Sequence, residues 1–208
     1  MEISESVQQN NNQPLVVILT GPSGVGKDAA LNELKKSERP WHYVVTATTR
    51  PRRHNETDGV DYIFMDEAEF RTSLENNEFL ESANVYDKWY GVPKSQVSGP
   101  LKQGLDVILK VDIQGAASIK SLIPNAISIF KIPGTLNDLE NRLRTRMTES
   151  EDQLQLRLEV AREELSKLND FEYYIINKEN SLESTVNQID TILAAEKQRL
   201  NRPHIEIT

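Results

Sequence analysis

A glycine-rich segment near the start of the chain has the spacing of a phosphate-binding loop. In GPSGVGKD, residues 21–28, Gly21, Gly26 and Lys27 match the pattern G-x-x-x-x-G-K. Glycines let the backbone curl so that successive N–H groups face inward, and the lysine adds a positive charge for phosphate oxygens. Average residue usage produces this string by chance in about one chain in twenty. Here it follows an apolar run and begins a helical segment, which predicts a nucleotide phosphate site.

The residue after the lysine departs from the usual pattern. Ser or Thr normally stands there and its hydroxyl holds Mg²⁺, whereas this chain has Asp28. A carboxylate is a good oxygen ligand for Mg²⁺, so Asp28 is a candidate metal ligand. It also brings negative charge close to the phosphates, which a metal ion or another cation has to neutralise. The alternative is an acidic residue in the first helical turn, where the helix dipole favours it by about 0.3 to 1 kcal/mol.

Short apolar runs alternate with helical patterns along most of the chain. The runs typical of strands buried on both faces are residues 15–19, 43–45, 106–111, 126–132 and 173–176. Apolar residues step by three and four over residues 154–168 and 182–193, as in amphipathic helices. Strands that alternate with helices predict an α/β fold in which helices flank a parallel central sheet. The phosphate loop then joins the first strand to a helix that begins near Lys27.

Residues 46–96 interrupt this rhythm. They are rich in β-branched and aromatic residues and carry turn signals at Asp58-Gly59 and Tyr90-Gly91, which predicts a small, mostly β insertion. A polar, arginine-rich stretch, residues 142–157, joins two predicted helices; taken alone, it is typical of a solvated face with Glu/Arg pairs. Residues 1–13 are polar and rich in Asn and Gln, as in a disordered tail, and residues 201–208 form a C-terminal tail.

Composition excludes several classes of function. Without cysteine, the chain has no disulfide, zinc–thiolate site or thiol catalysis, and its three histidines have no metal-ligand spacing. A net charge of −8 argues against broad nucleic-acid binding. No apolar run is long enough for a membrane helix, and the N-terminus has no signal-peptide pattern. We expect a cytoplasmic monomer or homodimer that acts on small molecules and binds neither nucleic acid nor membranes.

The motifs taken together resemble those of the guanylate kinases, over roughly residues 15–198. The matching segments are GPSGVGK at 21–27, TATTRPRR at 46–53, GVDYIF at 59–64, FLESANVYDKWYG at 79–91, VDIQGA at 111–116 and RLRTRMTESEDQLQLRL at 142–158. The resemblance implies a P-loop NTPase fold over residues 14–200. Its core comprises residues 14–45, 97–141 and 159–200, residues 46–96 form a GMP-binding region, and residues 142–158 form a helical lid.

The resemblance also implies an activity and a set of site residues. The activity is ATP- and Mg²⁺-dependent phosphorylation of GMP, and of dGMP, in purine nucleotide metabolism. For ATP it implies Gly21, Ser23, Gly24, Val25, Gly26, Lys27, Asp28 and, near the adenine, Asn177. For GMP it implies Thr46, Arg50, Arg53, Tyr62, Glu81, Tyr90 and Asp112. For catalysis it implies Lys27 with the lid arginines Arg142, Arg146 and Arg157. Guanidinium groups and phenols suit a dianionic phosphate, and the Glu81 carboxylate suits the N1–H and amino group of guanine.

Two further residues depart from the family pattern. Lys110 stands two positions before Asp112, where the family usually has an acid, and both side chains point to one face of the strand. A lysine there needs an anionic partner, so we predict that Lys110 and Asp28 lie close enough to interact. Val92 replaces a Thr or Ser whose hydroxyl helps to hold guanine, at a cost of about 0.5 to 1.5 kcal/mol in guanine affinity or selectivity. Asp112 can organise metal-bound water or Lys27, cap the following helix, or do both.

Two other functions remain open at this level. A guanylate kinase-like module that binds acidic or phosphorylated peptides would keep Arg50, Arg53 and the tyrosines but could discard the phosphate loop, which this chain retains. A related kinase of small phosphorylated molecules, such as a ribose bisphosphate kinase, would not need Glu81, although Val92 leaves room for it.

Overall fold

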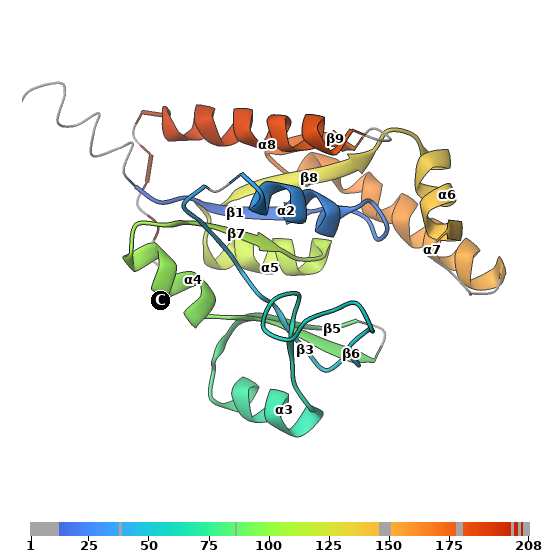
Figure 1. Ribbon diagram of the computed structural model, residues 1–208, viewed down its shortest axis with the longest axis horizontal. Helices are drawn as coiled ribbons and strands as arrows, with labels where there is room; N and C mark the ends of the chain where they lie inside the picture. The colour runs from blue at the N-terminus through green and yellow to red at the C-terminus, as the bar shows by residue number, and fades with distance from the viewer. Residues whose placement is uncertain are drawn as a thin grey trace, which may run out of the picture.

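The computed structural model describes residues 13–37, 39–85, 87–145, 151–177, 181–200, 202, 203 and 205. Within them, a five-stranded parallel sheet has the order β2-β7-β1-β8-β9 (Figure 1). Its strands are β1 (Val16–Thr20), β2 (Trp41–Tyr43), β7 (Asp106–Lys110), β8 (Ile127–Pro133) and β9 (Tyr173–Asn177). The predicted α/β architecture with a parallel central sheet is confirmed, and each of the five apolar runs overlaps one of these strands.

Helices cover both faces of this sheet because its central strands are apolar on both sides. Val17 and Leu19 of β1 pack with α2 (Lys27–Lys35) and α8 (Leu182–Lys197); Figure 1 shows α8 along the top of the molecule. Val16 and Ile18 pack on the opposite face with α4 (Ser95–Lys102) and α5 (Ile113–Leu122). Each of these four side chains is at most 1% exposed, and burial of such a side chain stabilises the fold by about 1.5 to 3 kcal/mol. The phosphate loop therefore begins at the end of a rigid strand.

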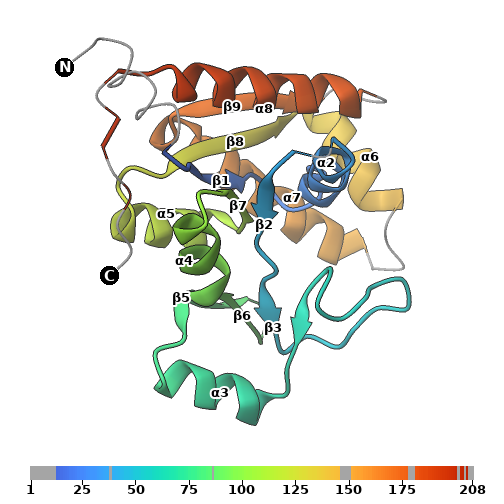
Figure 2. The same cartoon turned by 60° about the vertical axis from the view of Figure 1, so that its left-hand side comes forward.

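The insertion forms a second sheet beside the core, with the order β4-β3-β6-β5 (Figure 2). Its strands are β3 (Ala47–Thr48), β4 (Ile63–Phe64), β5 (Phe79–Val85) and β6 (Lys88–Pro93). A helix that the β-rich pattern did not predict, α3 (Glu67–Glu75), begins at a capping box formed by Asp66 and Glu69. Phe70 of this helix stacks on Phe79, with ring centroids 4.5 Å apart. This aromatic packing holds α3 against the small sheet.

Only one of the two predicted turns in the insertion is correct. The chain turns at Gly59, whose φ is 74° and whose N–H donates to the Tyr62 carbonyl. The turn predicted at Tyr90-Gly91 is wrong, because both residues lie inside β6. Glycine stands at position 91 for a packing reason: a Cβ there would lie 2.7 Å from the Phe79 ring. The chain instead reverses between β5 and β6, next to Asp87, whose φ is 59°.

The predicted lid falls on two helices, α6 (Leu136–Thr145) and α7 (Glu151–Ser166), and residues 146–150 lie outside the described residues. The ends of the arginine-rich stretch are therefore helical. A separate apolar cluster holds α6 against α7 and consists of Leu139, Leu143, Leu154, Leu158 and Ala161. A short 3₁₀ helix, Leu168–Asp170, leads from α7 to β9.

The two predicted tails lie largely outside the described residues, which begin at Gln13 and include only residues 202, 203 and 205 beyond position 200. The Gln13 carbonyl accepts a hydrogen bond from Lys197 Nζ at 3.0 Å. In the described part of the chain, none of the helices combines the length and the apolar character that crossing a bilayer requires.

Candidate active site

The phosphate loop follows β1 and ends where α2 begins. Gly21 and Gly26 have φ values of 140° and 90°, in a region that disfavours other residues. A Cβ at position 21 would also lie 2.3 Å from the Lys131 carbonyl oxygen, so the loop passes β8 at a distance that only glycine allows. Lys27 is the first residue of α2, which directs the positive end of the helix dipole toward the loop.

Side chains from three other elements donate to carbonyls of the loop. Asn177 at the end of β9 donates through Nδ2 to the Val25 carbonyl at 2.7 Å, and Arg142 Nη1 lies 3.3 Å from the same oxygen. Lys131, a fully buried residue of β8, donates to the Gly26 carbonyl at 2.8 Å. These donors fix the peptide groups of the loop, on whose orientation phosphate binding by backbone N–H groups depends. That Asn177 lies near the adenine stays a prediction. Its hydrogen bond to the Val25 carbonyl shows that it also supports the structure of the loop.

Lys27 folds back over the loop. Its Nζ donates to the Gly21 carbonyl and lies 3.3 Å from the Pro22 carbonyl. Burial lowers the pKa of Lys27 to about 8, although the carboxylates of Glu164 and Asp28 act in the opposite direction. The ammonium is thus held where it can move onto a phosphate, and an anionic ligand would restore its full charge.

The lid helix α7 also reaches the loop, through Ser23. Arg157 of α7 donates from Nη2 to Ser23 Oγ at 2.8 Å, and the Ser23 N–H donates to Glu164 Oε2 at 3.2 Å. Burial raises the pKa of Glu164, which the Ser23 N–H and Lys27 partly oppose. The structure therefore brings Arg142 and Arg157 to the phosphate loop. The third predicted lid arginine, Arg146, lies outside the described residues.

A second cluster, of groups that are chemically suited to a phosphate, lies in the insertion. The Arg50 guanidinium lies 5.2 Å from the centroid of the Tyr62 ring, and the Tyr62 and Tyr90 rings are 6.2 Å apart. Glu56 positions Arg50 through a 2.7 Å ion pair, in which both side chains are at most 15% exposed. Arg53 lies at the edge of this cluster, with a 70% exposed side chain 3.9 Å from Glu56. Three of the four residues predicted to bind the GMP phosphate therefore lie together, and the fourth faces solvent beside them.

The predicted guanine-reading residues are set between β5 and α5. A Cβ at position 115 would lie 3.2 Å from Glu81 Oε2 and 3.3 Å from Asp112 Oδ1, so both carboxylates meet over Gly115. Burial raises the pKa of Glu81 to about 7, and the charge of Asp112 adds to this effect. Asp112 Oδ1 accepts from the Gly115 N–H at 2.7 Å, which confirms the predicted helix cap. Thr46, which follows β2, is buried.

Val92 lies opposite Glu81 in the ladder between β5 and β6. Its side chain is fully buried in the apolar cluster beneath the sheet, together with Leu80 and Leu109. A hydroxyl at this position would enter an apolar environment, where an unpaired polar group is costly.

The predicted pairing of Asp28 with Lys110 is confirmed. Lys110 Nζ donates to Asp28 Oδ1 in an ion pair, and Lys110 is the more enclosed partner, with 16% exposure against 64% for Asp28. The same ammonium donates to the Tyr62 hydroxyl at 3.2 Å and lies 4.8 Å from the centroid of its ring. Burial alone would lower the pKa of Lys110, but Asp28 and Tyr62 raise it above its ordinary value. One lysine therefore connects the helix after the phosphate loop with the arginine–tyrosine cluster.

Three residues of this site were not predicted from the sequence. Lys131 could have been found, because a lysine inside the apolar run AISIFKIP needs a polar partner within the fold. Glu56 and Glu164 lie in polar segments where acidic residues are common, and only their contacts with Arg50 and Ser23 distinguish them. No local pattern identifies them.

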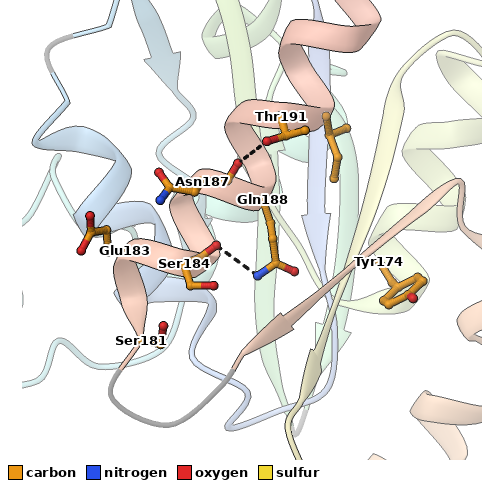
Figure 3. A pocket seen from close by; sticks show the side chains of 8 residues that line it. Tyr174, Ser181, Glu183, Ser184, Asn187, Gln188 and Thr191 are labelled. Carbon is orange, nitrogen blue, oxygen red and sulfur yellow. Dashed lines mark hydrogen bonds between the residues drawn. The ribbon is translucent and has the colours of Figure 1, made fainter.

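A groove of about 670 Å³ lies outside this site, between β9 and α8 (Figure 3). It is lined by Tyr174, Ser181, Glu183, Ser184, Asn187, Gln188, Thr191 and Ile192. Gln188 closes part of the sheet edge there, since its amide donates to the Ile176 carbonyl at 3.2 Å and accepts from the Ile176 N–H at 3.0 Å. None of the residues predicted to bind ATP or GMP lines this groove.

Comparison with known proteins agrees with this geometry. The family model described as guanylate kinase matches residues 13–196. Guanylate kinase 2, chloroplastic/mitochondrial, of Oryza sativa subsp. japonica is 41% identical, over 94% of this chain and 69% of that protein. The guanylate kinase of Rickettsia bellii is 42% identical, over 91% of this chain and 98% of that protein. The crystal structure of guanylate kinase from Anaplasma phagocytophilum matches with a TM-score of 0.75 and 30% identity, covering 92% of this chain and 90% of that chain.

The matches extend over the phosphate loop, the insertion and the lid helices, and they rest on sequence as well as on fold. Among the described residues, the segments that resemble this family also converge in space, on the phosphate loop and on the arginine–tyrosine cluster. The chain belongs to the guanylate kinase family.

Proposed function

We propose that the protein transfers the terminal phosphoryl group of ATP to GMP, and to dGMP, forming ADP and the nucleoside diphosphate. The observation that carries this proposal is the position of Lys110, whose ammonium contacts both Asp28 beside the phosphate loop and Tyr62 in the second cluster. Two sets of phosphate-binding groups therefore lie within the reach of one side chain. Direct transfer between two phosphates needs such proximity.

On the donor side, the phosphate loop binds the ATP phosphates with its backbone N–H groups and with Lys27. Arg142 and Arg157 already contact the loop at Val25 and Ser23, and they would place positive charge on the transferred group. Arg146, the remaining lid arginine, is assigned the same role. The other residues that we assign to ATP are Gly21, Ser23, Gly24, Val25, Gly26, Asp28 and Asn177.

On the acceptor side, Arg50, Arg53, Tyr62 and Tyr90 hold the GMP phosphate. Glu81 reads guanine, since an ionised carboxylate accepts from both the N1–H and the amino group, a donor pair that adenine lacks. Thr46 and Asp112 complete the guanine end. The proximity of Asp112 to Glu81 keeps this end acidic, which favours a base with two donors.

The chemistry requires no covalent intermediate. A phosphate oxygen of GMP attacks the terminal phosphorus of ATP in line, a P–O bond to that oxygen forms, and the P–O bond to ADP breaks. The attacking oxygen is already anionic, so no side chain has to act as a strong base. The side chains contribute position and neutralisation of charge, and closure of the lid excludes water that would otherwise accept the phosphoryl group.

The residues beside the loop fit a Mg²⁺ ion that is held mainly by ATP. In the described part of the chain, no cluster of three metal-ligating side chains occurs. Mg²⁺ in nucleotide sites typically takes one or two carboxylates together with phosphates and water, and Asp28 offers a carboxylate that is 64% exposed beside the loop. Asp28 would hold the ion, with Asp112 organising its water. When bound, Mg²⁺ neutralises charge on the ATP phosphates.

We propose a cytoplasmic location and a monomer or homodimer that acts without nucleic acid. A peptide-binding module would have no use for lid arginines that contact the phosphate loop. A ribose bisphosphate kinase would have no use for the neighbouring carboxylates of Glu81 and Asp112.

The test is ADP formation with ATP, Mg²⁺ and each of GMP, dGMP, AMP, CMP and UMP. Wild type should turn over only the guanine nucleotides. Lys27→Ala should lower kcat about a hundredfold or more, since it removes the loop cation. Lys36→Ala, which removes an exposed cation at the end of the same helix, is the matched control. Turnover of AMP as fast as GMP, or no turnover of any monophosphate, would contradict the proposed function.

A further inference from the structure

Lys110 lies at the edge of the sheet where both phosphate sites meet. It is the last residue of β7 and lies directly opposite Leu19 of β1, one residue before that strand ends. Ligands of open α/β sheets bind at the carboxyl ends of parallel strands. The position of Lys110 therefore belongs to the ligand-binding edge of the core, although its side chain reaches toward the insertion.

The contacts of Lys110 orient its ammonium and its neighbour. An ammonium has three N–H donors. Two of those of Lys110 are used by the hydrogen bonds to Asp28 Oδ1 and to the Tyr62 hydroxyl oxygen. Because Tyr62 accepts from Lys110 in this pair, its own O–H is available to donate elsewhere. The guanidinium of Arg50 also lies over the Tyr62 ring, 5.2 Å from its centroid. The Lys110 ammonium and the Arg50 guanidinium thus both lie against the ring of Tyr62.

The charged and titratable groups beside Lys110 come from α2 and from the insertion. Lys27 and Asp28 come from the start of α2, and Tyr62 comes from the insertion. The positive charge of Lys110 contributes to the lowered pKa of Lys27. Asp28 balances the Lys110 ammonium and Glu56 balances the Arg50 guanidinium, and the dianionic phosphate of a ligand would add to these interactions. Enclosure of the Lys110 side chain, which is 16% exposed, would make its interaction with a phosphate stronger than that of a surface lysine.

We propose that Lys110 is a phosphate-binding residue of the GMP pocket, anchored by Asp28 and sharing the acceptor phosphate with Tyr62 and Arg50. A lysine is thus used where the family usually has an acid, and Asp28 is its counter-ion. The inference rests on the proposed function, because it needs GMP in this pocket. The competing explanation is that Lys110 only neutralises Asp28.

Calorimetric titration with GMP and with guanosine, without ATP or Mg²⁺, separates these explanations. In Lys110→Gln, the Kd for GMP should rise about ten- to a hundredfold, the usual effect of a lost charge-assisted hydrogen bond. The Kd for guanosine should stay unchanged, because guanosine has no phosphate. Lys110→Arg, which keeps the cation, should recover most of the GMP affinity.

The double variant Asp28→Asn with Lys110→Gln is decisive, because it removes the ion pair as a whole. The proposal requires the double variant to bind GMP as weakly as Lys110→Gln. Wild-type GMP affinity in the double variant would overturn the proposal and leave Lys110 as the counter-ion of Asp28. An equal loss for GMP and guanosine would also overturn it, since the change would then act on pocket packing. If wild type binds neither ligand, the proposed function itself fails.

Discussion

Glu81 combines a functional requirement with a cost in stability. Its carboxyl is partly buried between β5 and α5, near Asp112, and burial raises its pKa to about 7 from an ordinary 4.5. An acid whose pKa is higher in the folded state stabilises the fold at low pH and loses that contribution as pH rises through the folded pKa. Replacing Glu81 with Gln should remove this loss, because the amide does not ionise.

The size of the effect follows from the two pKa values. With an unfolded pKa of 4.5 and a folded pKa of about 7, ionisation of Glu81 costs the folded state about 1.4 kcal/mol at pH 5.5 and about 3.4 kcal/mol at pH 8.5. The stability of Glu81→Gln relative to wild type should therefore increase by about 2 kcal/mol between these pH values. Any pH-independent effect of the new amide cancels in this comparison.

Urea unfolding of both proteins at pH 5.5 and 8.5 measures the difference. Glu75→Gln, at an exposed position at the end of α3, is the control for the loss of a carboxylate outside the site. Guanosine titration gives the functional counterpart: wild-type affinity should fall below about pH 7, as the carboxylate that accepts two donors becomes protonated. A Glu81→Gln offset that does not change with pH would refute the reasoning.

Three further changes have expected outcomes. ATP affinity should fall above about pH 8 as the free Lys27 ammonium loses its proton, and ATP titrations of Lys27→Met should lack this pH dependence. Lys131→Met should raise the unfolding free energy at pH 6 by about 1 to 3 kcal/mol, because burial lowers the pKa of Lys131 to about 7. That gain in unfolding free energy, measured by urea titration, should shrink above pH 7. The ATP affinity of Lys131→Met should be lower than that of wild type, because the Gly26 carbonyl loses its donor. Val92→Thr should lower the unfolding free energy by about 1 to 3 kcal/mol, since Val92 is fully buried. The ratio of kcat/KM for GMP to kcat/KM for AMP should be measured in Val92→Thr and in wild type. An unchanged ratio would show that the new hydroxyl does not reach the base.

The fold was predictable wherever the pattern is local. A strand buried on both faces requires a continuous apolar run, and each such run overlaps a strand of the large sheet. The glycines of the phosphate loop were predictable because positive φ values and the close approach to Lys131 admit no side chain. In contrast, α3 was missed because this nine-residue helix is short and is flanked by β-branched and aromatic residues, from which the whole insertion was interpreted as mostly β. Gly91 was misread as a turn because glycine also serves close packing, here against Phe79.

The sequence by itself determined the phosphate loop, the order of the motifs and the need of Lys110 for an anionic partner. These features depend on residue type, spacing and the cost of an unpaired buried charge. Only the tertiary structure decided that Lys110 also contacts Tyr62, that Glu56 positions Arg50, and that Asn177 and Lys131 hold the loop carbonyls. Those contacts join residues 48 to 152 positions apart in three of these cases. Such pairs form when strands and helices pack, and neighbouring residues along the chain carry no record of them.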